Sequence, residues 1–169
     1  MNGLVTGIIF CLITALIYLL DINMFSNLLI PIGMGVVNMC IVIIAMVLSI
    51  KKVRETVIDQ TLNYGGRFFT GLIVGIVAAW ISGLFSYLLF QVIDPEWMLQ
   101  QIEGMADMLM NMGLPEDDAY AQVDDARENL KPAKQFLSAF VYTPAFYIVV
   151  SLIVSAFVKE KKKTEIETS

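Results

Sequence analysis

The chain has 169 residues, of which 57% are hydrophobic and 16% charged, and its formal net charge is −5 at pH 7. Its mean hydropathy of +0.73 lies far above that of a typical soluble domain. A soluble core of this size cannot bury several long apolar runs, so the composition excludes an ordinary soluble domain and favours a membrane protein.

Four apolar runs follow one another along the chain. They are residues 3–20, 28–50, 68–93 and 136–158, and none contains a charged residue or a histidine. At about 1.5 Å per residue, each is long enough to cross a hydrocarbon core of about 30 Å. A β-barrel would instead show strands of roughly ten residues that alternate in polarity. We therefore predict a single all-α integral membrane domain with four transmembrane helices.

The first run begins without a basic residue and is not followed by the small-residue pattern of a cleavage site. We therefore expect it to be a retained helix rather than a signal peptide.

The connecting segments differ in charge. Residues 51–67 and the tail 159–169 together hold eight of the basic residues, whereas residues 94–135 hold ten acidic residues and three basic ones. The positive-inside rule then puts 51–67, 159–169 and both termini in the cytoplasm, and 94–135 on the outer side. The acidic balance also argues against nucleic acid as a partner, because no segment offers the basic surface that phosphates need.

The outer segment contains the signals of two helices. Asp94 and Pro95 are typical of a helix start and Gly113 of a helix end, while Pro115 precedes a second helix that ends before Pro132. The first of these helices carries one apolar stripe at helical spacing, which consists of Met98, Ile102, Met105, Leu109 and Met112. We predict an extracytoplasmic helical hairpin that buries its stripes against one another or on the membrane helices.

Metal binding is considered for two groups in this segment. Four methionines, Met105, Met108, Met110 and Met112, could hold the soft ion Cu(I), but the segment has no histidine or cysteine, and Met110 is expected to point away from the stripe. Packing is the favoured interpretation. The acidic residues lack the spacing of a calcium loop. We expect no metal and no cofactor.

Small residues recur every four positions in two of the runs. The first packing seam consists of Gly3, Gly7, Cys11 and Ala15, and the second consists of Gly71, Gly75, Ala79 and Gly83. Such seams let helix backbones approach closely in lipid, within one chain or between copies in a homo-oligomer. Cys11 and Cys40 are expected to remain free, and Pro144 to kink the fourth run.

Few residues of the chain could act in catalysis or in ion transport. The chain has no histidine, its apolar runs have no ionisable side chain, and no nucleophile has a recognisable base. We therefore expect that the protein is not an enzyme. The same lack of charge weakens an ion-coupled transporter, although Asn38, Ser82, Ser86 and Gln91 are candidates for a polar path.

The third run and its exit, RFFTGLIVGIVAAWISGLFSYLLFQVIDPEW, precede an acidic helical insertion and the last run. This arrangement resembles a bacterial membrane family known as domain of unknown function 4199, in which a glycine like Gly71 and an exit like residues 93–96 recur. The resemblance covers nearly the whole chain. It implies the inner membrane of a Gram-negative bacterium of the Bacteroidetes lineage, and it implies no activity.

Two functions remain. The first is a non-enzymatic scaffold or assembly partner in the inner membrane, whose outer hairpin offers its methionine stripe to a membrane or periplasmic protein. The alternative is a small oligomeric channel or carrier that uses the second packing seam as a subunit contact.

Overall fold

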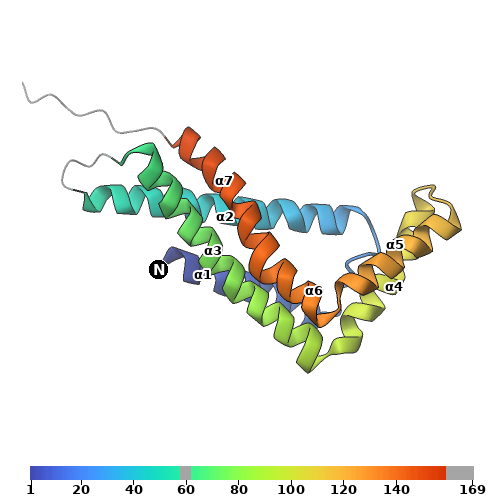
Figure 1. The fold of residues 1–169 in the computed structure, drawn as a ribbon. Helices are drawn as coiled ribbons and strands as arrows, with labels where there is room; N and C mark the ends of the chain where they lie inside the picture. Colours follow the sequence, from blue (N-terminus) through green and yellow to red (C-terminus); the bar gives the residue numbers. More distant parts are fainter. Residues whose placement is uncertain (58–61, 159–169) are drawn as a thin grey trace, which may run out of the picture.

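The computed structural model describes residues 1–57 and 62–158, and within these ranges all regular secondary structure is helical (Figure 1). The elements are α1 (Asn2–Leu19), α2 (Leu29–Thr56), α3 (Tyr64–Leu88), the π-helical η1 (Leu89–Ile93), α4 (Pro95–Asn111), α5 (Glu116–Asn129), α6 (Pro132–Leu137), the π-helical η2 (Ser138–Tyr142) and α7 (Thr143–Phe157).

Four helical stretches of the described chain are long and apolar enough to cross a membrane, as predicted. They are Asn2–Leu19, Leu29–Thr56, Tyr64–Ile93 and Pro132–Phe157. Most of their large apolar side chains face outward, including Leu12, Ile44, Phe69 and Ile153, and a hydrocarbon solvent accounts for this exposure. The helices extend beyond the apolar runs, so Arg67, which the sequence analysis assigned to a loop, lies within α3 and is buried.

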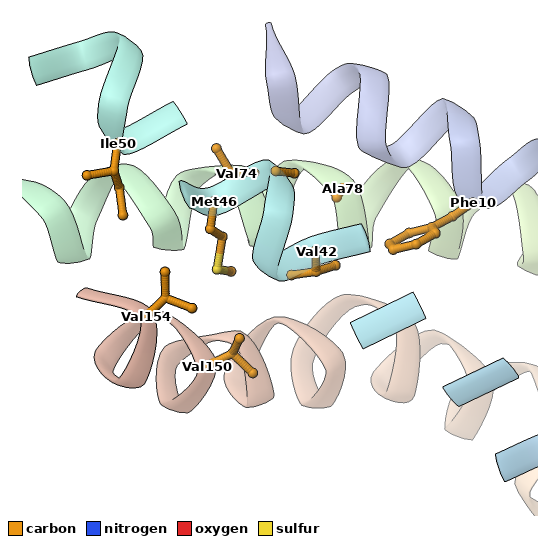
Figure 2. Packing of buried hydrophobic residues seen from close by; sticks show 9 residues of the cluster. Phe10, Val42, Met46, Ile50, Val74, Ala78, Val150 and Val154 are labelled. Atoms are coloured by element: carbon orange, nitrogen blue, oxygen red, sulfur yellow. The ribbon is translucent and has the colours of Figure 1, made fainter. Parts of the chain in front are cut away.

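The third span is the centre of the bundle. Helix α3 contacts α1, α2 and α7, and the core lies where these helices meet (Figure 2). Met46 and Ile50 of α2 are fully buried between Val74 of α3 and Val154 of α7. An unbranched methionine fills the irregular space left between crossing helices.

Two π-helical turns interrupt the spans at the end that leads to α4 and α5. η1 closes the third span, and η2 separates α6 from α7 immediately before Pro144. Proline has no backbone N–H and its ring crowds the preceding turn, which favours a wider turn there. The predicted irregularity at Pro144 therefore takes the form of a π turn, and the Thr143 hydroxyl donates to the Ser138 carbonyl at 2.9 Å across it.

Helices α4 and α5 lie side by side beyond the end of the bundle (Figure 1). Asp94 caps α4 by accepting from the Trp97 amide at 3.0 Å, and Pro95 is the first helical residue. At the other end Gly113 has φ +93°, and its amide and that of Leu114 donate to the carbonyls of Met110 and Leu109. These two bonds form a Schellman motif. Helices α4 and α5 therefore begin and end where the sequence predicts.

Candidate functional site

Several side-chain hydrogen bonds join distant segments where α1, α4 and η1 meet, a region we call the junction. Its residues are Tyr18, Asp21, Gln91, Asp94, Trp97 and Gln101. They come from segments far apart in sequence, and their side chains hold the α4–α5 pair on the membrane helices.

The Asp94 carboxylate accepts two hydrogen bonds, one with each oxygen. While one oxygen caps α4, the other accepts a hydrogen bond from the Tyr18 hydroxyl of α1 at 3.1 Å. A carboxylate has acceptor positions for both donors. The start of α4 is therefore tied to the end of α1.

Trp97 is the largest side chain of the junction and is only 6% exposed. Its ring stacks on Phe90 at 5.9 Å and meets Tyr18 edge-on at 5.4 Å, while its indole N–H donates to Asp21 at 3.2 Å. Asp21 itself has φ +46°, a conformation that aspartate tolerates better than most residues. The tight turn after α1 thus presents the acceptor that the buried indole needs.

Gln101 continues the junction one turn along α4. It is 5% exposed, and its side-chain oxygen accepts from the Met24 amide at 2.8 Å. Close by, a Cβ added at Gly104 would lie 3.4 Å from the Asn23 side chain, so α4 passes directly over the loop between α1 and α2.

Gln91 fixes the other side of the pair. Its amide nitrogen in η1 donates to the Leu130 carbonyl at 2.7 Å and to the Gln135 side chain at 2.6 Å. These bonds join the third span to the end of α5 and to α6. The α4–α5 pair is therefore held both where α4 begins and where α5 ends.

Surface salt bridges also connect the end of α5 with Lys131, α6 and α4. Glu128 of α5 lies 3.2 Å from the Lys134 ammonium and 3.4 Å from that of Lys131. The hydrogen bond from Lys134, followed by that from Lys131, lowers the pKa of the Glu128 carboxyl. On the other flank, Arg127 pairs with Glu103 of α4 at 3.2 Å.

The α4–α5 pair has its own small core, which consists of Ile102, Ala106 and Val123. Met98 and Met105 of the predicted stripe pack against this core, as does Phe25 of the loop. Leu109 is half-buried, and Met112 is 50% exposed. Most of the stripe is therefore covered within the chain, and Met112 is its most exposed member.

Met110 corrects the sequence analysis. It was expected to point away from the stripe, but it packs against the same core. The physical reason is that Ala106 and Met110 follow Ile102 by four and eight positions, which keeps them on one helical face. The buried face of α4 is wider than the sequence pattern suggested.

A polar cavity of about 260 Å³ adjoins the junction through Gln135. It lies between α3 and the segment α6–η2–α7, and its walls are Ala79, Ser82, Gly83, Ser86, Gln135, Ser138, Ala139 and Thr143. Ser82 donates to the Ala78 carbonyl within α3, and Thr143 of α7 donates to the Ser138 carbonyl of η2. Hydroxyl and amide groups suit uncharged polar molecules or water. Of the residues suggested for a polar path, Ser82 and Ser86 line the cavity and Gln91 lies next to it, whereas Asn38 lies apart.

The first packing seam faces α3. A Cβ added at Gly3 would lie 2.9 Å from the Val74 carbonyl oxygen, and one at Gly7 would lie 2.7 Å from the Ile81 Cβ. The Cys11 thiol is 3.8 Å from the Ile81 carbonyl, and Ala15 is half-buried. Both cysteines are free, as predicted.

The second packing seam faces α7 and η2, the π-helical turn that precedes α7. Added Cβ atoms would lie 2.7 Å from the Ser151 hydroxyl at Gly71, 2.8 Å from the Tyr147 Cβ at Gly75 and 2.9 Å from the Ala139 Cβ at Gly83, while Ala79 is 2% exposed. The structure therefore places both seams at contacts within the chain.

The sequence analysis did not identify Asp21, Gln101 or Gln135 as members of a site. The available signal was a glutamine on the apolar side of an amphipathic helix, since Gln101 is next to Ile102 and precedes Met105 by four positions.

No curated protein and no solved structure matches the chain. The model of one family, described as Protein of unknown function (DUF4199), matches residues 1–160. Together with the four membrane-length helices, this match identifies the chain as a member of the DUF4199 family.

Proposed function

We propose that this protein is a non-enzymatic scaffold of the bacterial inner membrane, which holds the acidic α4–α5 pair on the outer side for a partner protein. The observation that carries the proposal is the junction. Its buried glutamine and tryptophan and its two hydrogen-bonded carboxylates fix the helix pair to the bundle where α4 begins, and Gln91 fixes the pair where α5 ends, which is more than an inert connection between two spans requires.

The orientation follows from charge. The basic segments 51–67 and 159–169 favour the cytoplasmic side, and the C-terminal end of α2 that leads into the first of them lies far from the α4–α5 pair (Figure 1). With both termini in the cytoplasm, the pair is a hairpin outside the cytoplasm. Residues 58–61 and 159–169 lie outside the described residues, so this inference uses only their sequence.

The surface that the pair offers is acidic. Since much of the apolar stripe packs on α5, a partner would meet mainly the outer face of α5, where Glu116, Asp117, Asp118, Asp124 and Asp125 are exposed. Tyr120 lies on the same helix and is 50% exposed. Aromatic residues are enriched in protein interfaces, and a field of carboxylates attracts basic surfaces. We propose a membrane or periplasmic protein with a basic patch as the partner.

Crosslinking in membranes followed by purification tests this proposal. Proteins captured by the native chain should be lost when Asp117, Asp118, Asp124 and Asp125 are replaced by asparagine. The control is a chain with Lys51 and Lys52 replaced by glutamine, which alters charge at the opposite end of the molecule. Equal capture by both variants, or capture by neither the native chain nor its variants, would contradict the scaffold.

A small oligomeric channel or carrier is the second candidate. The cavity beside Ser82, Ser86 and Thr143 favours it, because a hydroxyl-lined space between spans can hold an uncharged polar solute. Liposomes containing the purified protein should then show faster entry of a small neutral solute such as glycerol, and Ser86→Leu should abolish the difference. Rates equal to those of empty liposomes would exclude this candidate.

A further inference from the structure

A second opening lies at the other end of the molecule, between the C-terminal halves of α2 and α7. Its volume is about 570 Å³, which is within the range of small-molecule sites. Its walls are Ile43, Val47, Lys51 and Arg54 of α2 and Ile153, Val154, Phe157 and Val158 at the end of α7. We call this opening the α2–α7 groove. Its deepest wall is Val154, which points from α7 towards α2 (Figure 2).

The groove is apolar along most of its length and basic at one end. On α2, Ile43, Val47 and Lys51 follow one another at intervals of four residues, so they lie on one face of the helix. Lys51 is therefore about 12 Å along the helix axis from Ile43. This distance is close to half of a hydrocarbon core of about 30 Å. A molecule with its charged group at Lys51 would have its apolar part extend to the middle of the membrane.

The charged groups among the described residues of the lining are basic. Lys51 is exposed, and Arg54 follows it by three positions on the same face. Arg54 also takes part in another interaction, and since a guanidinium has five donors, it can add a hydrogen bond to a group held at Lys51. Two basic groups beside an apolar wall at a membrane surface match the phosphate and the acyl chain of a lipid.

We propose that the α2–α7 groove binds an anionic phospholipid, whose phosphate contacts Lys51 and Arg54 and whose acyl chain lies against Val47, Ile153 and Phe157. This site is separate from the junction and does not depend on the proposed function. In the orientation proposed above, the lipid belongs to the cytoplasmic leaflet.

The test uses the purified full-length chain in a neutral detergent, with lipid binding measured by native mass spectrometry. Phosphatidylglycerol should bind more tightly than phosphatidylcholine, and inorganic phosphate should not compete at matched concentration. Lys51→Gln should weaken phosphatidylglycerol binding by about 5-fold, since one basic group near a membrane surface is worth about 1 kcal/mol. The double variant with Arg54→Gln should lose more.

Lys52 supplies the matched control. It is adjacent in sequence but lines a different opening, beside Asn2 and Thr70. Lys52→Gln removes the same charge and should leave binding unchanged. Equal losses in the Lys51 and Lys52 variants would mean diffuse attraction and would overturn the proposal, as would equal binding of the two lipids.

A second variant tests the apolar wall without touching the charges. Ile153 is 54% exposed, so Ile153→Trp can be accommodated without disturbing the core while its ring fills the groove. Circular dichroism should show unchanged helicity, and phosphatidylglycerol binding should fall. Undiminished binding by this folded variant, or effective competition by inorganic phosphate, would show that no acyl chain occupies the groove.

Discussion

Gly75 lies where both α7 and α2 pack tightly on the backbone of α3. A Cβ at this position would be 2.8 Å from the Tyr147 Cβ and 2.9 Å from the Met46 methyl group. The methionine can move, but the Tyr147 Cβ is attached directly to the α7 backbone. The alanine variant therefore forces α3 and α7 apart, and overpacking of this kind costs about 1–3 kcal/mol.

The chain contains a control for the same substitution. Gly35 lies within the second span, and a Cβ there would have no heavy atom within 4 Å. Gly35→Ala should stabilise α2 by about 0.5–1 kcal/mol, because alanine loses less backbone entropy than glycine in a helix. This gain is common to both variants. The difference in unfolding free energy between Gly75→Ala and Gly35→Ala therefore isolates the clash.

Unfolding in mixed micelles of increasing denaturing detergent, followed by circular dichroism, measures both variants. Gly75→Ala should unfold at a lower detergent fraction than the native chain, and Gly35→Ala at an equal or higher one. If Gly75→Ala were as stable as Gly35→Ala, α3 and α7 would not pack through this seam. If its loss of stability appeared only at protein concentrations that support self-association, the seam would join two copies instead.

Three further predictions concern the junction, the orientation in the membrane and the salt bridges of Glu128. Gln101→Leu should lower the free energy of unfolding by about 1–3 kcal/mol, because the Met24 amide loses its acceptor. The same substitution at the exposed Gln100 should have little effect. Equal effects of the two substitutions would show that the buried hydrogen bond is unimportant. In a chain with Cys11 and Cys40 replaced by alanine, Asn111→Cys should react with an impermeant thiol reagent in intact spheroplasts and Thr56→Cys should not, and the reverse labelling would refute the orientation. The pKa of Glu128 is lowered in the folded chain, so the stabilisation by its ion pairs is complete above the ordinary pKa of 4.5 and is lost as the pH falls through the folded value. The rate of amide exchange at Leu130 should therefore differ between the native chain and Glu128→Gln at neutral pH, and the two rates should converge in acid. A difference that stays constant with pH would exclude these ion pairs as the cause.

The sequence predicted the features that depend on neighbouring residues and on the solvent. The four spans follow from uncharged runs of sufficient length, because hydrocarbon leaves the backbone no partner except itself. Asp94 and Gly113 predicted both ends of α4, since a cap and a left-handed residue act locally. The spacing of Gly71 and Gly75 predicted a packing seam, and the structure shows that Ser151 and Tyr147 of α7 cover it.

The junction could not be predicted in the same way. Gln91 and Gln101 are polar residues near the ends of apolar stretches, and such residues usually face water or headgroups. Their partners, the Leu130 carbonyl and the Met24 amide, are backbone groups far away in sequence, and any residue type could supply them. Only the path of the chain between the spans brings them together.

The two ends of the molecule differ in the regularity of their helices. At the α4–α5 end, two π turns interrupt the helices, the buried Gln101 side chain binds the Met24 amide, and a hydroxyl-lined cavity lies between α3 and the segment α6–η2–α7. At the other end, α2 continues without interruption to the basic residues Lys51 and Arg54, and the rest of the lining of the α2–α7 groove is apolar. A regular helix satisfies its own backbone and can face lipid, whereas a π turn leaves backbone groups that need neighbours. The irregular end therefore suits the proposed attachment of α4–α5 outside the lipid, and the regular end suits the proposed lipid site.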